Sequence, residues 1–239
     1  MRRGRLAAAL AALICAAGTA RAQDNLASTL VAAAPAANPK VLQLAVRAAD
    51  CARRQGLLES FHRLAVIDYS LPSTAPRLWV FDVDRGRLLF QELVAHGRNT
   101  GETVARHFSN VEGSKMSSLG LFQATDTYYG SNGYSLRLRG LDAGFNDRAL
   151  DRAIVMHGAP YVSEAIAEHL GRLGRSWGCP AVSQDVARGM IDTLKGGALL
   201  FAYYPDDKWL SGSTFFKCGS AGSNDSVIAS ADESRHPRG

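Results

Sequence analysis

Residues 77–95 read RLWVFDVDRGRLLFQELVA, two apolar runs separated by a short polar turn. The runs predict two strands at 77–83 and 87–95, and Asp84-Arg85-Gly86 between them predicts a hairpin-like turn. Working outward, similar apolar runs predict further strands at 61–69, 119–124, 134–138, 153–157 and 198–204. Many short strands with few helices predict a mainly β fold, a sandwich or a barrel, rather than the alternating strands and helices of a Rossmann fold.

Helices are predicted at three places by capping residues followed by apolar residues at helical spacing. The first begins after Asn38-Pro39 and ends near Gln55, where Gly56 follows. The others begin at Ser163 and Ser183 and end near Leu170 and Leu194. We therefore expect a few helices packed on the β-structure.

The N-terminus has the pattern of an export signal. Arg2, Arg3 and Arg5 precede an apolar stretch at 6–17, and Ala20-Arg21-Ala22 is a small-x-small cleavage site. We expect cleavage before Gln23, in preference to an uncleaved anchor, and no stable membrane insertion afterwards. Of 27 basic residues, four lie in the signal, which leaves 23 against 22 acidic ones. A net charge of about +1 gives no reason to expect a nucleic-acid partner.

The chain after the signal is expected to have three parts and three cysteines. Residues 23–60 are predicted to form a linker and helix, 61–210 the main domain and 211–239 a flexible tail. An odd number of cysteines in an exported protein implies one free thiol. A Cys51–Cys218 disulfide would leave Cys179 free, although the sequence alone permits any pairing.

Cys179 lies in the stretch GRSWGCPAV, residues 174–182. Gly178 permits close backbone approach, and Pro180 followed by helix caps predicts a helix N-terminus that would favour a thiolate and supply N–H groups to an oxyanion. The alternative is a buried structural cysteine. A Gly-Cys-Pro turn among polar residues favours a nucleophile.

A thiol with a pKa of about 8.5 needs a base. His157 ends the apolar run AIVM and precedes Gly158, and His96 likewise ends an apolar run and precedes a glycine. The residues alone do not decide between these two histidines. Ser176 is a candidate to position the catalytic groups, and Arg175 and Arg139 are candidates to bind a carboxylate. There is no phosphate-binding glycine loop or paired-cysteine zinc spacing, so no cofactor or metal is expected.

Several segments together resemble a known family. IVMHG at 154–158 and RSWGC at 175–179 are similar to the signature of L,D-transpeptidase catalytic domains. The resemblance is stronger to a divergent branch of murein L,D-transpeptidase catalytic-domain-like proteins, with segments similar to VAHGRNTG, FSN, KMSSLG, GYSLRLRGL, GFND and GRSWGCPAV. It covers roughly residues 78–205.

The resemblance implies a β-rich catalytic domain in which Cys179 is the nucleophile and His157 the base, held by a backbone carbonyl. The implied reaction acylates Cys179 with a peptidoglycan stem tetrapeptide, releases D-alanine and transfers the acyl group to an amine of a second stem. Gly158, Ser176, Trp177, Gly178, Arg175, Arg139 and His96 are candidates to position the substrate or its oxyanion.

Two residues depart from the common family motif. Trp177 stands where that motif has a second histidine, and Pro180-Ala181 replaces an apolar-Arg pair. Two alternatives therefore stay open. One is an L,D-carboxypeptidase or related peptidase in which water resolves the same acyl-enzyme. The other is a non-catalytic wall-binding module.

Overall fold

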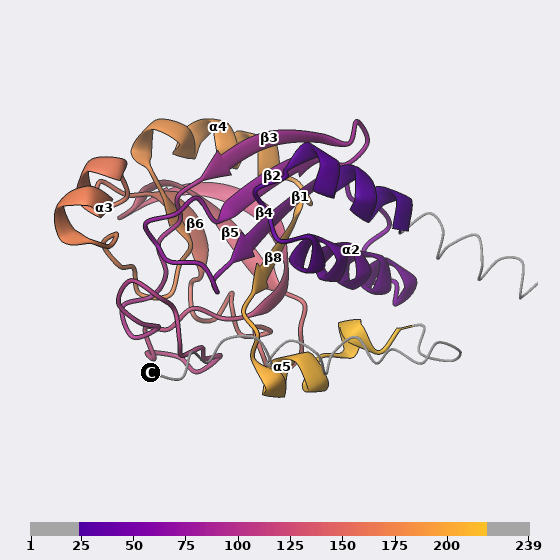
Figure 1. Ribbon diagram of the computed structural model, residues 1–239. Coiled ribbons are helices and arrows are strands. Elements are labelled where there is room, and N and C mark those ends of the chain that lie inside the picture. The colour runs from indigo at the N-terminus through magenta and orange to yellow at the C-terminus, as the bar shows by residue number, and fades with distance from the viewer. Residues whose placement is uncertain (1–23, 219–239) are drawn as a thin grey trace, which may run out of the picture.

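The structure is a computed structural model that describes residues 24–218. Its eight strands form one sheet (Figure 1). The strands are β1 (Arg63–Asp68), β2 (Leu78–Asp82), β3 (Arg87–Glu92), β4 (Gly120–Gly130), β5 (Gly133–Gly140), β6 (Val155–Gly158), β7 (Ala181–Val182) and β8 (Leu199–Tyr203). The helices are α2 (Pro39–Arg54), α3 (Glu164–Leu170), α4 (Gln184–Leu194), α5 (Asp207–Gly212) and a 3₁₀ helix at Thr214–Phe216.

The sheet closes almost completely on itself. Its order is β3-β2-β1-β8-β4-β5-β6-β7, with β1–β8 and β6–β7 parallel and the other pairs antiparallel. Beyond β3, the backbone N–H of Ala95 donates to the carbonyl of Ala181 in β7 at 2.8 Å. This bridge joins the two ends of the strand order. The predicted mainly β fold with a few helices is confirmed, in its barrel-like form.

Three central strands supply much of the core. All residues of β2 and β8, and all but the first of β1, are buried. Strands that are covered on both faces carry continuous apolar runs, as LAVI, LWVF and LLFAY do here. The helix α2 packs against β1, β4 and β8, whereas α4 packs mainly against β6 and also contacts β1 and β5 (Figure 1). The site described below lies at the β6–β7 end of the sheet.

The predicted elements are present with small changes in their bounds. Asn38 caps α2 by accepting from Lys40 N–H, and Pro39 begins the helix as predicted. The strands β4 and β5 are longer than predicted, and β7 was not predicted because two residues carry no periodicity.

Both ends of the described chain are more ordered than predicted. Residues 24–33 are helical where a linker was expected, and alanine's high helix propensity accounts for this. At the other end, the flexible tail was predicted to begin at residue 211, but α5 and the 3₁₀ helix continue the ordered chain to Phe216. Their side chains Trp209 and Phe215 are buried. The predicted signal peptide at 1–22 and the tail beyond 218 lie outside the described residues. No helix within 24–218 combines the length and apolarity needed to cross a bilayer.

The predicted disulfide between Cys51 and Cys218 is confirmed. It joins the last turn of α2 to the residues after the 3₁₀ helix, with a Cα–Cα distance of 5.6 Å. The two cysteines are 167 residues apart. In the chain-entropy model, closing such a long loop removes roughly 5 kcal/mol of conformational freedom from the unfolded state. Cys179 is the free cysteine of the described residues.

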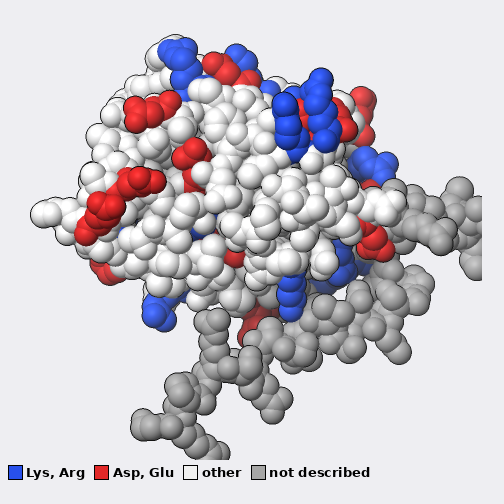
Figure 2. Space-filling model, turned by 45° about the horizontal axis from the view of Figure 1, so that its top comes forward, with Lys and Arg blue, Asp and Glu red and all other residues white. Residues whose placement is uncertain are grey.

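Charges of both signs are spread over the surface. Figure 2 shows acidic side chains gathered at the left of one face, toward α3, and a basic group at its upper right, with a largely uncharged area between. Glu164 and Glu168 of α3 are both exposed. This face does not carry the single-sign field that attracts a polyanion.

Candidate active site

Cys179 lies in a tight turn that precedes β7. Its side chain is 8% exposed, and its Sγ lies 3.5 Å from the Val155 backbone N and 3.8 Å from the Ala153 carbonyl oxygen. The Ser176 hydroxyl donates to the Cys179 carbonyl at 2.6 Å and accepts from Gly178 N–H at 3.1 Å. Ser176 therefore closes the turn through its backbone contacts.

Gly178 is required by this packing. It has φ 123°, and a side-chain carbon there would lie 2.7 Å from the Met116 carbonyl oxygen. The Gly178 carbonyl accepts from the Ser117 hydroxyl at 3.1 Å, and that hydroxyl accepts from Gly97 N–H at 3.0 Å. Ser117 thus links the turn that contains Cys179 to Gly97 of the His96-Gly97 pair.

The expected helix N-terminus at the thiol is not what the structure contains. Helix α4 begins at Gln184, and β7 lies between it and Cys179. The N–H group that approaches Sγ belongs to Val155 of β6. The prediction of a helix-dipole effect was wrong because residues after Pro180 first extend into the sheet.

Burial raises the pKa of the Cys179 thiol, and the Val155 N–H and the charge of Arg152 oppose this rise without cancelling it. A thiol whose pKa lies above its usual value is protonated at neutral pH. Its use as a nucleophile therefore requires a base that removes the proton.

His157 lies near the end of β6, between Ser135 of β5 and Ala181 of β7 in the sheet register. It is 4% exposed, and burial lowers its pKa, so that the ring is neutral at neutral pH. Its Nδ1 lies 3.0 Å from the Gly158 carbonyl oxygen. A carbonyl only accepts, so Nδ1 carries the proton and Nε2 keeps its lone pair.

His96 is held at both ring nitrogens. Its Nδ1 lies 2.8 Å from Arg77 Nη2, which can only donate, and its Nε2 lies 3.1 Å from the Gly101 carbonyl oxygen, which can only accept. The ring is 1% exposed, and burial and the Arg77 charge lower its pKa to about 4. A neutral ring with both nitrogens engaged has no lone pair to offer a thiol.

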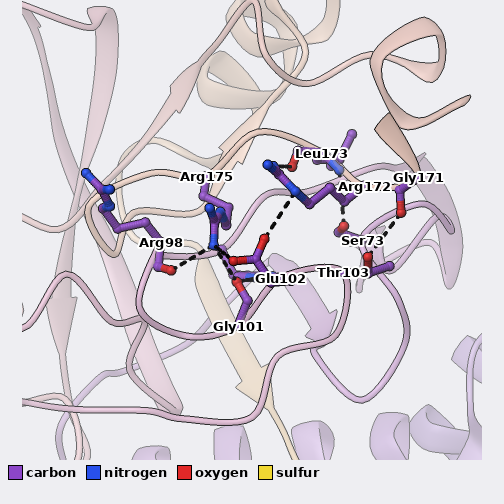
Figure 3. Close-up of polar contacts among 10 residues, drawn as sticks. Ser73, Arg98, Gly101, Glu102, Thr103, Gly171, Arg172, Leu173 and Arg175 are labelled. Carbon is purple, nitrogen blue, oxygen red and sulfur yellow. Dashed lines mark hydrogen bonds and ion pairs between the residues drawn. The ribbon is translucent and has the colours of Figure 1, made fainter. Parts of the chain in front are cut away.

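The two candidate arginines are engaged elsewhere. Figure 3 shows Arg175 and Arg172 converging on Glu102, and Arg175 Nη1 also donates to the carbonyls of Arg98 and Gly101. These contacts hold the loop after His96 against the segment before Cys179. Arg139 of β5 donates to Gln123 of β4. It lies four residues along β5 from Ser135, the residue that pairs with His157, which is about 13 Å at the spacing of residues in a strand.

Trp177 is the exposed residue of the turn. Its side chain is 71% exposed, and Lys115 Nζ lies 5.0 Å from the centre of its ring. An exposed aromatic ring next to a buried thiol is a ready surface for an incoming substrate. Lys115 was not a sequence candidate, although it begins the segment KMSSLG that carried part of the resemblance.

Ser117 and Arg152 were also missed. Ser117 occurs in the same segment, but nothing in its spacing indicated that its hydroxyl would contact Gly97 and Gly178. Arg152 precedes the AIVMH run, and no motif in the sequence singled it out. Only the packing of distant segments reveals either contact.

Comparison with known proteins identifies the family. A model of the L,D-transpeptidase catalytic domain matches residues 33–203, a range that contains all eight strands, α2 and both His-Gly pairs. The chain belongs to the L,D-transpeptidase catalytic-domain family. The predicted family is therefore confirmed. No curated protein matches this family member.

The solved structures that resemble this family member are only distantly similar to it in sequence. An L,D-transpeptidase from Mycobacterium smegmatis has 16% identity over 60% of this chain and 59% of that one, with a TM-score of 0.37. The LD transpeptidase LdtMt1 in complex with imipenem has 16% identity over 59% of each chain and a TM-score of 0.36. The helical cell shape determining protein Pgp2 from Campylobacter jejuni has 11% identity over 59% and 46%, with a TM-score of 0.38. The chain spans about three fifths of the first two structures and less than half of the third.

Proposed function

We propose that the protein is a peptidoglycan L,D-transpeptidase with Cys179 as its nucleophile and His157 as its base. The observation that carries the proposal is the tautomer of His157. The Gly158 carbonyl holds the proton on Nδ1, and Nε2 is left to accept a proton. The strand register supports this pairing of His157 with Cys179. His157 lies opposite Ala181 of the neighbouring strand β7, and Ala181 is two residues after Cys179 in the chain.

In the proposed first half-reaction, Nε2 takes the thiol proton and Sγ attacks the carbonyl of the third residue of a stem tetrapeptide. The carbon–nitrogen bond to the terminal D-alanine breaks, and the imidazolium returns its proton to the leaving amine. In the second half-reaction an amine of another stem attacks the thioester. The carbon–sulfur bond breaks, and the thiol regains a proton.

The oxyanion of each tetrahedral intermediate needs a hydrogen-bond donor. The Gly178 N–H already donates to Ser176 Oγ at 3.1 Å. We therefore assign the oxyanion to the backbone N–H of Cys179, in the turn that Ser176 closes. Trp177 takes the position of the usual second histidine and, being exposed, packs against the donor peptide in this proposal.

The proposed place of action is the periplasm or cell envelope. The N-terminal pattern of Arg2, Arg3 and Arg5 followed by an apolar stretch supports export. The Cys51–Cys218 disulfide also supports an oxidising compartment. Partial sequencing of the N-terminus of the protein from its native host tests the expected cleavage before Gln23.

Imipenem, which is bound to LdtMt1 in a solved structure, provides the first test. Cys15 lies in the apolar stretch of the predicted signal and is replaced by serine so that it cannot react. The chain with Cys15→Ser, purified without reductant, is incubated with imipenem and analysed by intact-mass spectrometry. We expect one adduct per molecule, absent from Cys179→Ala. Absence of an adduct on the folded parent would contradict the proposed nucleophile.

The reaction products distinguish the alternatives. Incubation with disaccharide tetrapeptides is expected to yield cross-linked dimers and free D-alanine. Tripeptide without dimer would replace the transpeptidase by a carboxypeptidase. Binding to sacculi that survives Cys179→Ala, without any turnover of the parent protein, would instead indicate a wall-binding module.

A further inference from the structure

The guanidinium of Arg152 is surrounded by neutral oxygens. It donates to four acceptors in the segment 109–118: the carbonyls of Ser109 and Met116 and the hydroxyls of Ser114 and Ser118. The ion pairs between residues 24–218 do not include Arg152. A half-buried cation whose hydrogen-bond partners carry no charge is unusual, because carboxylates commonly neutralise such groups.

The same arginine lies beside the nucleophile turn. A side-chain carbon at Gly178 would be 3.4 Å from Arg152 Nη2. Two backbone groups that contact Sγ of Cys179 belong to the chain directly after Arg152, namely the Ala153 carbonyl at 3.8 Å and the Val155 N–H at 3.5 Å. The Arg152 side chain therefore lies close to the turn at Gly178, and the backbone of Ala153 and Val155, which follow it in the chain, lies against the thiol.

Backbone strain gathers around these contacts. Within residues 24–218, Lys115 and Ala153 are the two non-glycine residues with positive φ, at 55° and 53°. Ala153 follows Arg152, and Lys115 lies between Ser114 and Met116, whose oxygens both accept from Arg152 Nη2. Left-handed conformations of residues with a Cβ persist only where the surroundings hold them, and they cluster at functional sites.

We propose that Arg152 is a positioning residue of the site, which fixes the segment 109–118 against the Gly178–Cys179 turn and supplies the positive charge that faces the Cys179 thiolate. This inference rests on the proposed function in that it takes Cys179 to be the nucleophile. The neutral oxygens around the guanidinium leave its charge uncompensated until the thiol ionises. The thiolate is then the anion that Arg152 lacks in the resting site.

The other titratable groups near the thiol do not supply this charge. Tyr69 and Tyr161 interact electrostatically with Cys179, but burial raises the pKa of each to about 12, so both are neutral at working pH. Burial also keeps His157 neutral by lowering its pKa. The Lys115 ammonium lies over the Trp177 ring. Arg152 is the cation whose charge lowers the pKa of Cys179 against the effect of burial.

The test is the pH dependence of Cys179 alkylation by iodoacetamide, measured without reductant on the chain with Cys15→Ser. The reaction reports the thiolate and requires no peptidoglycan. We expect Arg152→Gln to raise the midpoint by about one pH unit or more, which corresponds to a tenfold slower reaction at a fixed pH below it. Arg152→Lys keeps the charge, so its midpoint is expected to lie close to that of the parent.

The matched control is Arg148→Gln in the same loop, which removes the same charge from a side chain that pairs with Glu112 and Asp151. We expect its midpoint to stay at the parent value. A midpoint for folded Arg152→Gln equal to that of Arg148→Gln would overturn the proposal. If Arg152→Gln does not melt cooperatively, the test uses Arg152→Lys. An alkylation midpoint about a full pH unit above that of the parent, in Arg152→Lys that melts cooperatively, contradicts the role of the charge.

The imipenem experiment separates the two proposals. A shifted midpoint in Arg152→Gln without any imipenem adduct on the parent contradicts the proposed function and leaves only the effect of the Arg152 charge on the Cys179 thiol standing. An imipenem adduct on the parent together with an unshifted midpoint in Arg152→Gln supports the proposed function and contradicts the role of Arg152.

Discussion

The His96-Gly97 and His157-Gly158 pairs have the same local sequence pattern and opposite hydrogen-bonding situations. Both rings are almost fully buried next to a glycine at the end of an extended segment. The Nδ1 of His96 accepts from Arg77 and its Nε2 donates to Gly101, whereas among the described residues His157 has a hydrogen-bond partner only at Nδ1, the Gly158 carbonyl. The difference shows that an available nitrogen, rather than burial or position on a strand, separates a proposed base from a structural histidine.

Arg77 explains why His96 is used in this way. The Arg77 guanidinium is completely buried and donates to the carbonyls of Val94 and Leu71 as well as to His96. Each of its N–H groups needs an acceptor, because an unpaired donor on a buried charge is costly. His96 supplies one of them, and its other nitrogen ties the same cluster to the loop that Arg175 holds.

The largest expected effect comes from removing the proposed base. His157→Gln takes away the group that accepts the thiol proton, so the rate of acylation by imipenem is expected to fall about 10²–10⁴-fold. Stopped-flow or mass-spectrometric time courses measure this rate. The melting temperature is expected to change less than that of His96→Gln. A rate within threefold of the parent would remove His157 from the proposed mechanism.

The matched substitution at the other histidine, His96→Gln, is expected to lower the stability of the fold. His96→Gln disturbs the contacts to Arg77 and Gly101 and leaves a poorly filled buried space, at a cost of about 2–3 kcal/mol in the free energy of unfolding. Denaturant titration measures this loss. The acylation rate of the folded fraction is expected to stay within about threefold of the parent. A large loss of rate with unchanged stability would reverse the assignments of the two histidines.

A smaller effect, about 1.5 kcal/mol between pH 6.5 and pH 5, is expected in the pH dependence of stability. The pKa of His96 is about 4 in the folded protein and about 6.5 in an unfolded chain, so between these values the unfolded chain binds more protons. The free energy of unfolding therefore falls as the pH drops from 6.5 to 4, by on the order of 3 kcal/mol for full titration, of which about half is reached by pH 5.

The comparison of the parent with His96→Gln isolates this contribution. Burial raises the pKa values of Asp68 and Asp142, which gives an opposite pH dependence, but these groups are common to both proteins. We expect a flatter stability profile for His96→Gln between pH 6.5 and 5, measured by thermal or urea unfolding. Parallel profiles for the two proteins would contradict a neutral His96 in the fold.

The elements with strong local patterns were predictable. The runs around Trp79 and Phe201 indicated buried strands, and Asn38-Pro39 marked the start of α2. The short strand β7 was not predictable from two residues, and its presence moved α4 away from the thiol. The alanine-rich stretch at 24–33 lacked a pattern, although its composition favours a helix.

The site was predictable only in its outline. Cys179 and the two histidines were visible in the sequence, but Ser117, Lys115 and Arg152 meet the turn through contacts between segments far apart in the chain. The choice between His96 and His157 depended on a family resemblance, because their hydrogen-bond partners are set by tertiary packing. Trp177 as the mark of a divergent branch stays a prediction.

The Cys51–Cys218 bond turns most of the chain into a covalent ring. The ring encloses the eight strands of the described residues and the turn that contains Cys179, so a protease that cuts one surface loop between the two cysteines opens the ring without releasing a fragment. The two new ends stay tethered to the same barrel and can return to their places. A protein with this architecture can be cut once by a protease and still remain a single molecule.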